Sequence, residues 1–180
     1  MAREVVAVLW LFVPAYVANM APVFVRGRLE WMAGPIDGGR TWRGRRVLGD
    51  HKTWRGLVVG VLAGALTFAL QQAIFRAGWL QALALLDYDA CSPLPGALLG
   101  FGALLGDAVK SFFKRGLGIA PGGTWIPFDQ LDFLVGAWLC VLPVVTPPLL
   151  PLLCAAPIVF VGTLAVTAGG AGLGLKESWI

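Results

Sequence analysis

The sequence has little of the chemistry that soluble hydrolases and many metalloenzymes use. Its 180 residues include one histidine, one asparagine and three serines. A Ser-His-Asp triad and a multi-histidine metal site are therefore nearly excluded. The three cysteines, Cys91, Cys140 and Cys154, are widely spaced. This spacing predicts neither a zinc motif nor a disulfide framework.

Charged residues are also scarce. They make up 13% of the chain, whereas 58% of the residues are hydrophobic. A typical soluble domain is about 25% charged and about 45–50% apolar. With a mean hydropathy of +0.77, this chain has more apolar surface than one globular core can bury. The composition excludes a soluble enzyme and a disordered chain, and it indicates that a lipid bilayer covers the excess.

Long apolar runs predict the membrane spans. A spanning helix needs about 20 mostly apolar residues, and five segments meet this requirement. We therefore expect an all-α, polytopic membrane protein that forms a single domain over residues 1–180, with cytoplasmic loops at about 26–56 and 114–130. The five spans are expected at about 5–25, 57–75, 94–113, 131–150 and 152–175.

The basic residues predict the orientation of these spans. Twelve of the fourteen lie in segments 26–55 and 110–130 or near the C-terminus, and only Arg3 and Arg76 lie elsewhere. With five spans, the two loops and the C-terminus share one side of the membrane. The positive-inside rule then predicts a multi-pass protein of the cell membrane with its N-terminus outside and its C-terminus in the cytoplasm.

The third expected span carries charge at membrane depth. Asp107, Lys110, Ser111 and Lys114 are spaced at i, i+3, i+4 and i+7, so they share one face of a helix. Charged groups inside a membrane are costly and by default mark a functional site. The alternative is a carboxylate that reaches to the interface, but the shared face favours a site.

Two more carboxylates, Asp129 and Asp132, are three residues apart at the start of the fourth expected span. An acid at this position also complements the helix dipole, which is the simpler explanation for either one. Together with Asp107 they form a set of oxygen ligands without nitrogen or sulfur nearby. Such a set favours a hard cation such as Mg²⁺.

The first cytoplasmic loop mixes basic residues with glycine, acidic residues and threonine. A purely polybasic loop would bind anionic headgroups or set the topology. The mixture is more typical of a folded loop that binds an anionic substrate, whereas nucleic acid is an unexpected partner so close to the membrane. Its candidate residues are Asp37, Arg45, Arg46, Asp50, Lys52, Thr53 and Arg55. Asn19, near the cytoplasmic end of the first span, is expected either to bond another helix or to line the same site.

Two motifs resemble a known family. The segment from Gly106 to Arg115 reads GDAVKSFFKR, and the segment from Pro127 to Asp132 reads PFDQLD. Together they are similar to CDP-archaeol synthases, archaeal membrane cytidylyltransferases related to phosphatidate cytidylyltransferase. Segments 34–39 and 49–56 also resemble the first cytoplasmic loop of that family. The wider phosphatidate family is expected to have a His-Gly-Gly run where this chain has Pro127 and Phe128.

The resemblance implies a catalytic membrane domain and a reaction. CMP would pass from CTP to 2,3-bis-O-(geranylgeranyl)-sn-glycerol 1-phosphate, an isoprenoid ether lipid phosphate, with release of pyrophosphate. Asp107, Asp129 and Asp132 would hold Mg²⁺, while Lys110, Lys114 and Arg115 would hold phosphate oxygens with Ser111 as a donor. Lys52, Thr53 and Arg55, with Arg45 and Arg46, would contact CTP or the lipid phosphate.

Three other functions remain open from the sequence. A small transporter also uses intramembrane charge, but the outer halves of these spans hold almost none. A lipid-binding scaffold would explain the basic loop but not the three carboxylates. Another membrane lipid-phosphate transferase, such as phosphatidate cytidylyltransferase, would use the same residue types.

Overall fold

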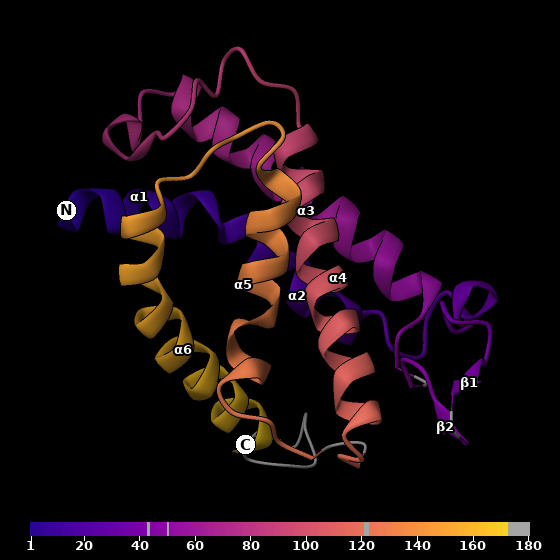
Figure 1. The fold of residues 1–180 in the computed structure, drawn as a ribbon. Coiled ribbons are helices and arrows are strands. Elements are labelled where there is room, and N and C mark those ends of the chain that lie inside the picture. The colour runs from indigo at the N-terminus through magenta and orange to yellow at the C-terminus, as the bar shows by residue number, and fades with distance from the viewer. Residues whose placement is uncertain (43, 50, 121–122, 173–180) are drawn as a thin grey trace.

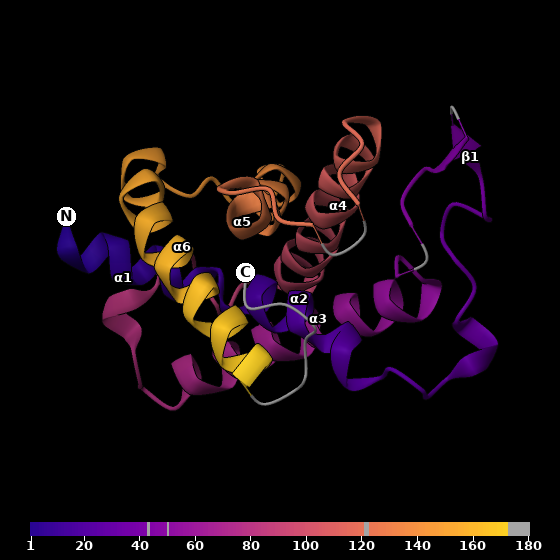
Figure 2. The same ribbon diagram turned by 90° about the horizontal axis from the view of Figure 1, so that it is seen from below.

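The computed structural model describes residues 1–42, 44–49, 51–120 and 123–172, and it is almost entirely helical (Figure 1). Six α-helices pack together, and a small hairpin lies at their edge (Figures 1 and 2). The expected all-α membrane fold is therefore confirmed. The elements are α1 (Ala2–Leu11), α2 (Val13–Phe24), η1 (Glu30–Met32), β1 (Thr41–Trp42), β2 (Arg45–Arg46), α3 (Trp54–Arg76), η2 (Gln81–Leu83), α4 (Leu94–Gly116), α5 (Phe128–Val141) and α6 (Leu149–Gly172).

The first expected span consists of two helices. α1 ends at Leu11 and α2 begins at Val13, with Phe12 as the residue between them. Pro14 lies in the first turn of α2, where its missing N–H costs no helical hydrogen bond. Together α1 and α2 form one 23-residue apolar segment, Ala2–Phe24, that is long enough to cross a membrane.

Four segments of the described chain are long and apolar enough to span a bilayer: Ala2–Phe24, Trp54–Arg76, Leu94–Gly116 and Leu149–Val166. The fifth expected span differs. α5 has 14 residues, which correspond to about 21 Å of helix, shorter than a hydrocarbon core of about 30 Å. It was expected to continue to residue 150 but ends at Val141. Pro143 lies two residues further on, and proline can neither donate the next helical hydrogen bond nor avoid the carbonyl four residues before it.

Small residues let the central helices approach closely. Gly64 of α3 faces Gly96 and Gly100 of α4, and Gly102 of α4 faces Gly136 of α5. A Cβ added at any of these positions would collide with backbone or side-chain atoms of the facing helix. These are the close contacts that small residues allow between membrane helices. As a result α4 lies between α3 and α5 and runs antiparallel to α5 (Figure 1).

The loop between α2 and α3 is folded. Its two ends are joined by the bridge between Pro35 and Thr53, in which Ile36 N–H donates to the Lys52 carbonyl at 2.8 Å. In the hairpin, Thr41 pairs with Arg46. The Trp42 ring lies 5.7 Å from the ring of Phe112 on α4, so the hairpin packs beside the end of that helix.

The connections lie at two ends of the bundle. The segments 77–93 and 142–148 lie together at one end, while the hairpin, the last turn of α4 and the first turn of α5 lie toward the other (Figure 1). Gln72 of α3 fixes the first of these segments by donating to the carbonyls of Tyr88 and Cys91. The hairpin and the charged ends of α4 and α5 therefore lie at the end of the bundle opposite to residues 77–93.

Candidate active site

The last two turns of α4 present the charged stripe that the sequence predicts. Asp107, Lys110 and Lys114 all contact the same polar cluster, as their helical spacing requires. Ser111 lies between them, and its hydroxyl donates to the carbonyl of Asp107 at 2.8 Å. This bond within the helix satisfies the hydroxyl while the side chain is buried.

The first two turns of α5 bring Asp129 and Asp132 to the same cluster. The backbone of α5 comes close because Gly106 of α4 has no side chain, and a Cβ there would collide with the Asp132 carbonyl. Asp132 accepts a hydrogen bond from the N–H of Phe133 at 2.7 Å. The two helices therefore hold three carboxylates on facing surfaces.

Lys110 lies at the centre of these carboxylates. Its Nζ is 3.0 Å from Asp107 Oδ1, 3.2 Å from Asp129 Oδ1 and 2.7 Å from Asp132 Oδ2. That oxygen of Asp132 is buried and makes no hydrogen bond within the described chain, so its contact with Lys110 is an ion pair of poor hydrogen-bond angle. One ammonium group therefore joins α4 to both acids of α5.

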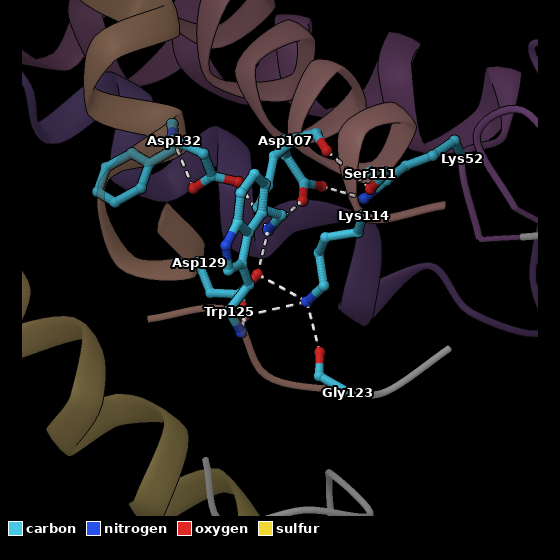
Figure 3. A network of polar contacts seen from close by, with 10 residues as sticks. Lys52, Asp107, Ser111, Lys114, Gly123, Trp125, Asp129 and Asp132 are labelled. Atoms are coloured by element: carbon cyan, nitrogen blue, oxygen red, sulfur yellow. Dashed lines mark hydrogen bonds and ion pairs between the residues drawn. The ribbon is translucent and has the colours of Figure 1, made fainter. Parts of the chain in front are cut away.

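Lys114 fixes the loop that leads into α5 (Figure 3). Its Nζ lies 2.9 and 3.0 Å from the two carboxylate oxygens of Asp129, and it also donates to the carbonyl of Gly123. The N–H of Trp125 donates to Asp129 Oδ2 at 2.5 Å. Both oxygens of Asp129 are thus already bonded by its own loop and by α4.

Lys52 joins the first cytoplasmic loop to the cluster. It donates to Asp107 Oδ2, the oxygen that Lys110 leaves open (Figure 3). The pairing of Ile36 with Lys52 and of Trp54 with Gly34 holds the backbone at this point. This ion pair, between residues 55 positions apart, connects the loop to α4 in addition to the contact of Trp42 with Phe112.

The cluster as a whole is electrically balanced. Three lysines, Lys52, Lys110 and Lys114, face three aspartates, Asp107, Asp129 and Asp132, so their formal charges cancel. All six side chains are between 6% and 23% exposed. A balanced and partly buried cluster has no net charge with which to attract a polyanion, and another cation would make it positive.

The carboxylates fit a hard metal ion in their chemistry. In the described parts of the chain, no three His, Cys, Asp or Glu side chains form a group that holds a metal ion as they stand. The three aspartates nevertheless converge on one point, the ammonium group of Lys110. Their donors are all oxygens, which is the ligand type that Mg²⁺ prefers. A divalent cation fits this set where it replaces that ammonium group.

Asp37 and Arg46, both predicted to bind substrate, contact each other within the first loop. Arg46 lies 3.0 Å from Asp37 Oδ1, and the N–H groups of Gly39 and Leu48 also donate to the carboxylate at 3.0 Å. Burial opposes ionisation, but the N–H groups and the guanidinium outweigh it and lower the pKa of Asp37. The structure therefore uses Asp37 to organise the loop, and a contact with substrate stays a prediction.

Thr53 and Arg55 also have structural partners. Thr53 is the N-cap of α3, and its hydroxyl accepts from Gly56 N–H at 3.2 Å. Arg55 donates to the Arg28 carbonyl at 2.6 Å and to Glu30 at 2.9 Å, which fixes η1 against α3. These contacts give both residues a structural role that requires no substrate.

The positions of the remaining candidates do not test their predicted roles. Asn19 is partly buried on α2 and Arg115 is partly buried in the last turn of α4. Asp50 and the side chain of Arg45 lie outside the described residues. Their predicted roles stay predictions.

The structure also adds backbone groups and neighbouring residues that were not among the predicted site residues. The Gly123 carbonyl and the Trp125 N–H act through the backbone, so no side-chain pattern indicates them. Gly106 acts by its lack of a side chain. Gln130 of α5 is 5% exposed, and its amide oxygen makes no hydrogen bond within the described chain. The signal that could have found it is its place between the two acids of the PFDQLD motif.

Comparison with known proteins decides the family. A family described as CarS-like CDP-archaeol synthase matches residues 1–180. The CDP-archaeol synthase of Thermococcus onnurineus is 46% identical over 140 residues, which cover 76% of this chain and 74% of that protein. That of Halorubrum lacusprofundi is 43% identical over 183 residues, with 94% of each chain covered. The chain belongs to the CDP-archaeol synthase family.

A solved structure supports the same assignment. It is described as an intramembrane enzyme for archaeal membrane lipids biosynthesis, and it matches this fold with a TM-score of 0.70. The two chains are 32% identical, and the match covers 88% of this chain and 91% of the other. The family resemblance and the expectation of a multi-pass membrane enzyme are thereby confirmed. Membership in this family favours an enzyme over the transporter and the scaffold.

Proposed function

We propose that this protein transfers CMP from CTP to 2,3-bis-O-(geranylgeranyl)-sn-glycerol 1-phosphate, giving the CDP-lipid and pyrophosphate. The observation that carries the proposal is the balanced cluster of three lysines and three aspartates where α4, α5 and the first loop meet. With a divalent cation bound this cluster would carry net positive charge, which suits a reaction between two anions that must be brought together and positioned. Family membership supplies the reaction class.

The reaction needs no nucleophilic side chain. The phosphate of the lipid is ionised near neutral pH, so one of its non-bridging oxygens attacks the α-phosphorus of CTP directly. A new phosphorus–oxygen bond forms, and the bond to the oxygen between the α- and β-phosphorus breaks. That oxygen leaves with the bonding electrons as part of pyrophosphate. The scarcity of serine, histidine and reactive cysteine agrees with this chemistry.

The lysines and Arg115 hold the reacting groups. Lys110 and Lys114 point into one cluster from one helix face, and Arg115 follows at the end of the same helix. Oriented cations reduce the repulsion between two phosphates and stabilise the charge that moves to the leaving pyrophosphate. Ser111 would add a neutral donor once its bond to the Asp107 carbonyl is exchanged for a phosphate oxygen.

Asp107, Asp129 and Asp132 would hold Mg²⁺. The bound ion would neutralise phosphate oxygens and orient them for in-line attack. Asp132 is suited to this role because its buried Oδ2 makes no hydrogen bond within the described residues. Asp129 would contribute a carboxylate that Lys114 and the Trp125 N–H orient.

The first loop would close the site from the cytoplasm. Lys52 already reaches Asp107, and Asp37 and Arg46 stiffen the loop that carries it. CTP would arrive from the cytosol, and the lipid would enter from the cytoplasmic leaflet of the cell membrane. In this proposal the N-terminus lies outside and the C-terminus in the cytoplasm, as the distribution of basic residues predicts.

The test is an incubation of the purified protein with CTP, MgCl₂ and one lipid phosphate at a time. Formation of the CDP-lipid, measured by mass spectrometry, is expected with the isoprenoid ether lipid phosphate. A preference for phosphatidate would assign the protein to the alternative phosphatidate cytidylyltransferase reaction. Product with neither lipid in the presence of Mg²⁺ would contradict the proposed transfer.

A further inference from the structure

We infer that Lys110 is an exchangeable counter-cation, which holds the three carboxylates before Mg²⁺ binds and is then released toward the substrate phosphates. This inference rests on the proposed function, because it assigns the divalent cation to the same aspartates. It adds an exchange of one positive charge for another inside the protein. The exchange would link metal binding to the capture of the polyanion.

The geometry around Lys110 supports this exchange. Its Nζ lies within 3.2 Å of carboxylates from Asp107, Asp129 and Asp132, so it stands where the three ligands converge. An ammonium group and a metal ion cannot share that point. Binding of the metal ion therefore requires the lysine side chain to leave.

The other lysines can remain when Lys110 leaves. Lys52 pairs with the outer oxygen of Asp107, and Lys114 is held by Asp129 and by the Gly123 carbonyl. Asp132 differs, because Lys110 is its only ion-pair partner among the described residues. Asp132 is also the least exposed of the three acids, at 6%. Asp132, the most buried of the three carboxylates, therefore depends on Lys110 for its positive partner.

The charge balance explains why exchange would be useful. Without the metal ion the six side chains cancel, so the site does not attract a triphosphate. A divalent cation would leave the cluster with two excess positive charges. The ammonium group of Lys110, carried on a flexible four-carbon side chain, would then be available to a phosphate oxygen on the same helix face. Metal and nucleotide would bind cooperatively through one lysine.

The experiment measures thermal unfolding of the full-length protein in detergent, with EDTA and across a titration of MgCl₂ alone. In EDTA, Lys110→Met is expected to unfold at a lower temperature than the wild type, because Asp132 is left buried and unpaired. MgCl₂ should restore the variant, with a midpoint about tenfold lower than for the wild type, within the usual range of coupling between two sites. Arg76→Met, which breaks the exposed pair with Asp89 at the opposite end, should leave the midpoint unchanged.

A double variant and a labelling measurement guard against simple misfolding. Lys110→Met combined with Asp132→Asn removes both charges, so its stability in EDTA should return toward that of the wild type while its response to MgCl₂ is lost. In the wild type, MgCl₂ should increase the reaction of Lys110 with an amine reagent, relative to the amino group of Met1. Both readouts are independent of activity.

Equal MgCl₂ midpoints for the wild type and Lys110→Met, or no response of either protein, would overturn the exchange. Unchanged labelling of Lys110 would do the same. The proposed function fails in a different way, namely when the wild type makes no CDP-lipid. A wild type that makes product but shows equal midpoints would retain the function and remove the role of Lys110.

Discussion

Lys110 Nζ lies 2.7 Å from Asp132 Oδ2, although the two residues belong to different helices and are 22 positions apart in the sequence. The contact crosses the interface between α4 and α5, which is one of the tightest in the protein because glycines line it. The packing of α4 against α5 therefore sets the geometry of the site. A change in the spacing of these helices is expected to change the chemistry.

Asp132→Asn is expected to reduce the rate of CDP-lipid formation about a hundredfold or more, the usual cost of losing one oriented charge at a transition state. The variant should still fold, because asparagine keeps the shape of the side chain and Lys110 retains two other carboxylates. The measurement is kcat and KM for CTP. Asp89→Asn, an exposed acid paired with Arg76 at the other end, is the matched control and should keep wild-type kinetics.

Gly106→Ala is expected to destabilise the protein by about 1–3 kcal/mol, the typical cost of overpacking. The new methyl group would collide with the Asp132 carbonyl and push α5 away from α4. Activity should fall more than stability, because the carboxylates would no longer converge. Gly162→Ala on α6 is the control, since nothing lies within 4 Å of its Cβ position. Equal effects of the two substitutions on activity would contradict the account.

The lowered pKa of Asp37 predicts how the first loop responds to pH. Its pKa in the folded protein lies below the value of about 3.9 expected in an unfolded chain. The contacts of its carboxylate therefore stabilise the loop above a pH of about 4 and are lost as the pH falls through the lower folded value. Hydrogen exchange at the N–H groups of Gly39 and Leu48, corrected for intrinsic rates, should stay slow between about pH 5 and pH 8.

Asp37→Ala removes the same acceptor at neutral pH. Exchange at Gly39 and Leu48 should then become up to about tenfold faster, as expected for the loss of one hydrogen bond at each site. Asp89→Ala should leave both groups unaffected. Protection that is unchanged in Asp37→Ala would mean that the carboxylate does not organise the loop.

The predicted orientation is testable by cysteine labelling in intact cells. In a variant whose native cysteines are replaced, Arg40→Cys should be shielded from a membrane-impermeant reagent, because residue 40 is expected in the cytoplasm. Ala90→Cys, exposed at the opposite end of the bundle, should react. The reverse pattern would invert the topology and place the charged cluster on the outer side.

Local patterns in the sequence predict the parts of the fold that depend on local physics. Apolar runs located the membrane helices, and the spacing of Asp107, Lys110 and Lys114 located one face of α4. The break at Phe12 and the end of α5 at Val141 were missed. Both helix boundaries depend on single residues, Pro14 and Pro143. In a prediction from sequence, the long apolar run around each proline outweighs its effect.

The sequence could predict which residues belong to the site, but not which of them contact one another. The sequence grouped Asp107 with Asp132 as metal ligands and selected Lys52 as a substrate contact, but nothing in it shows that Lys52 crosses 55 positions to reach Asp107. It also suggested direct substrate contacts for Thr53 and Arg55, whose described bonds cap α3 and fix η1. Contacts between distant segments depend on how the helices pack, and a single sequence contains no direct record of that packing.

The transfer of CMP can be measured most directly with CTP labelled at either the α- or the γ-phosphorus. The wild-type protein is incubated with MgCl₂ and the isoprenoid ether lipid phosphate, and the lipid and aqueous fractions are counted. The account predicts that the α-label enters the lipid fraction while the γ-label leaves as pyrophosphate. Label from the γ-position in the lipid, or no label from the α-position, would contradict cytidylyl transfer by this protein.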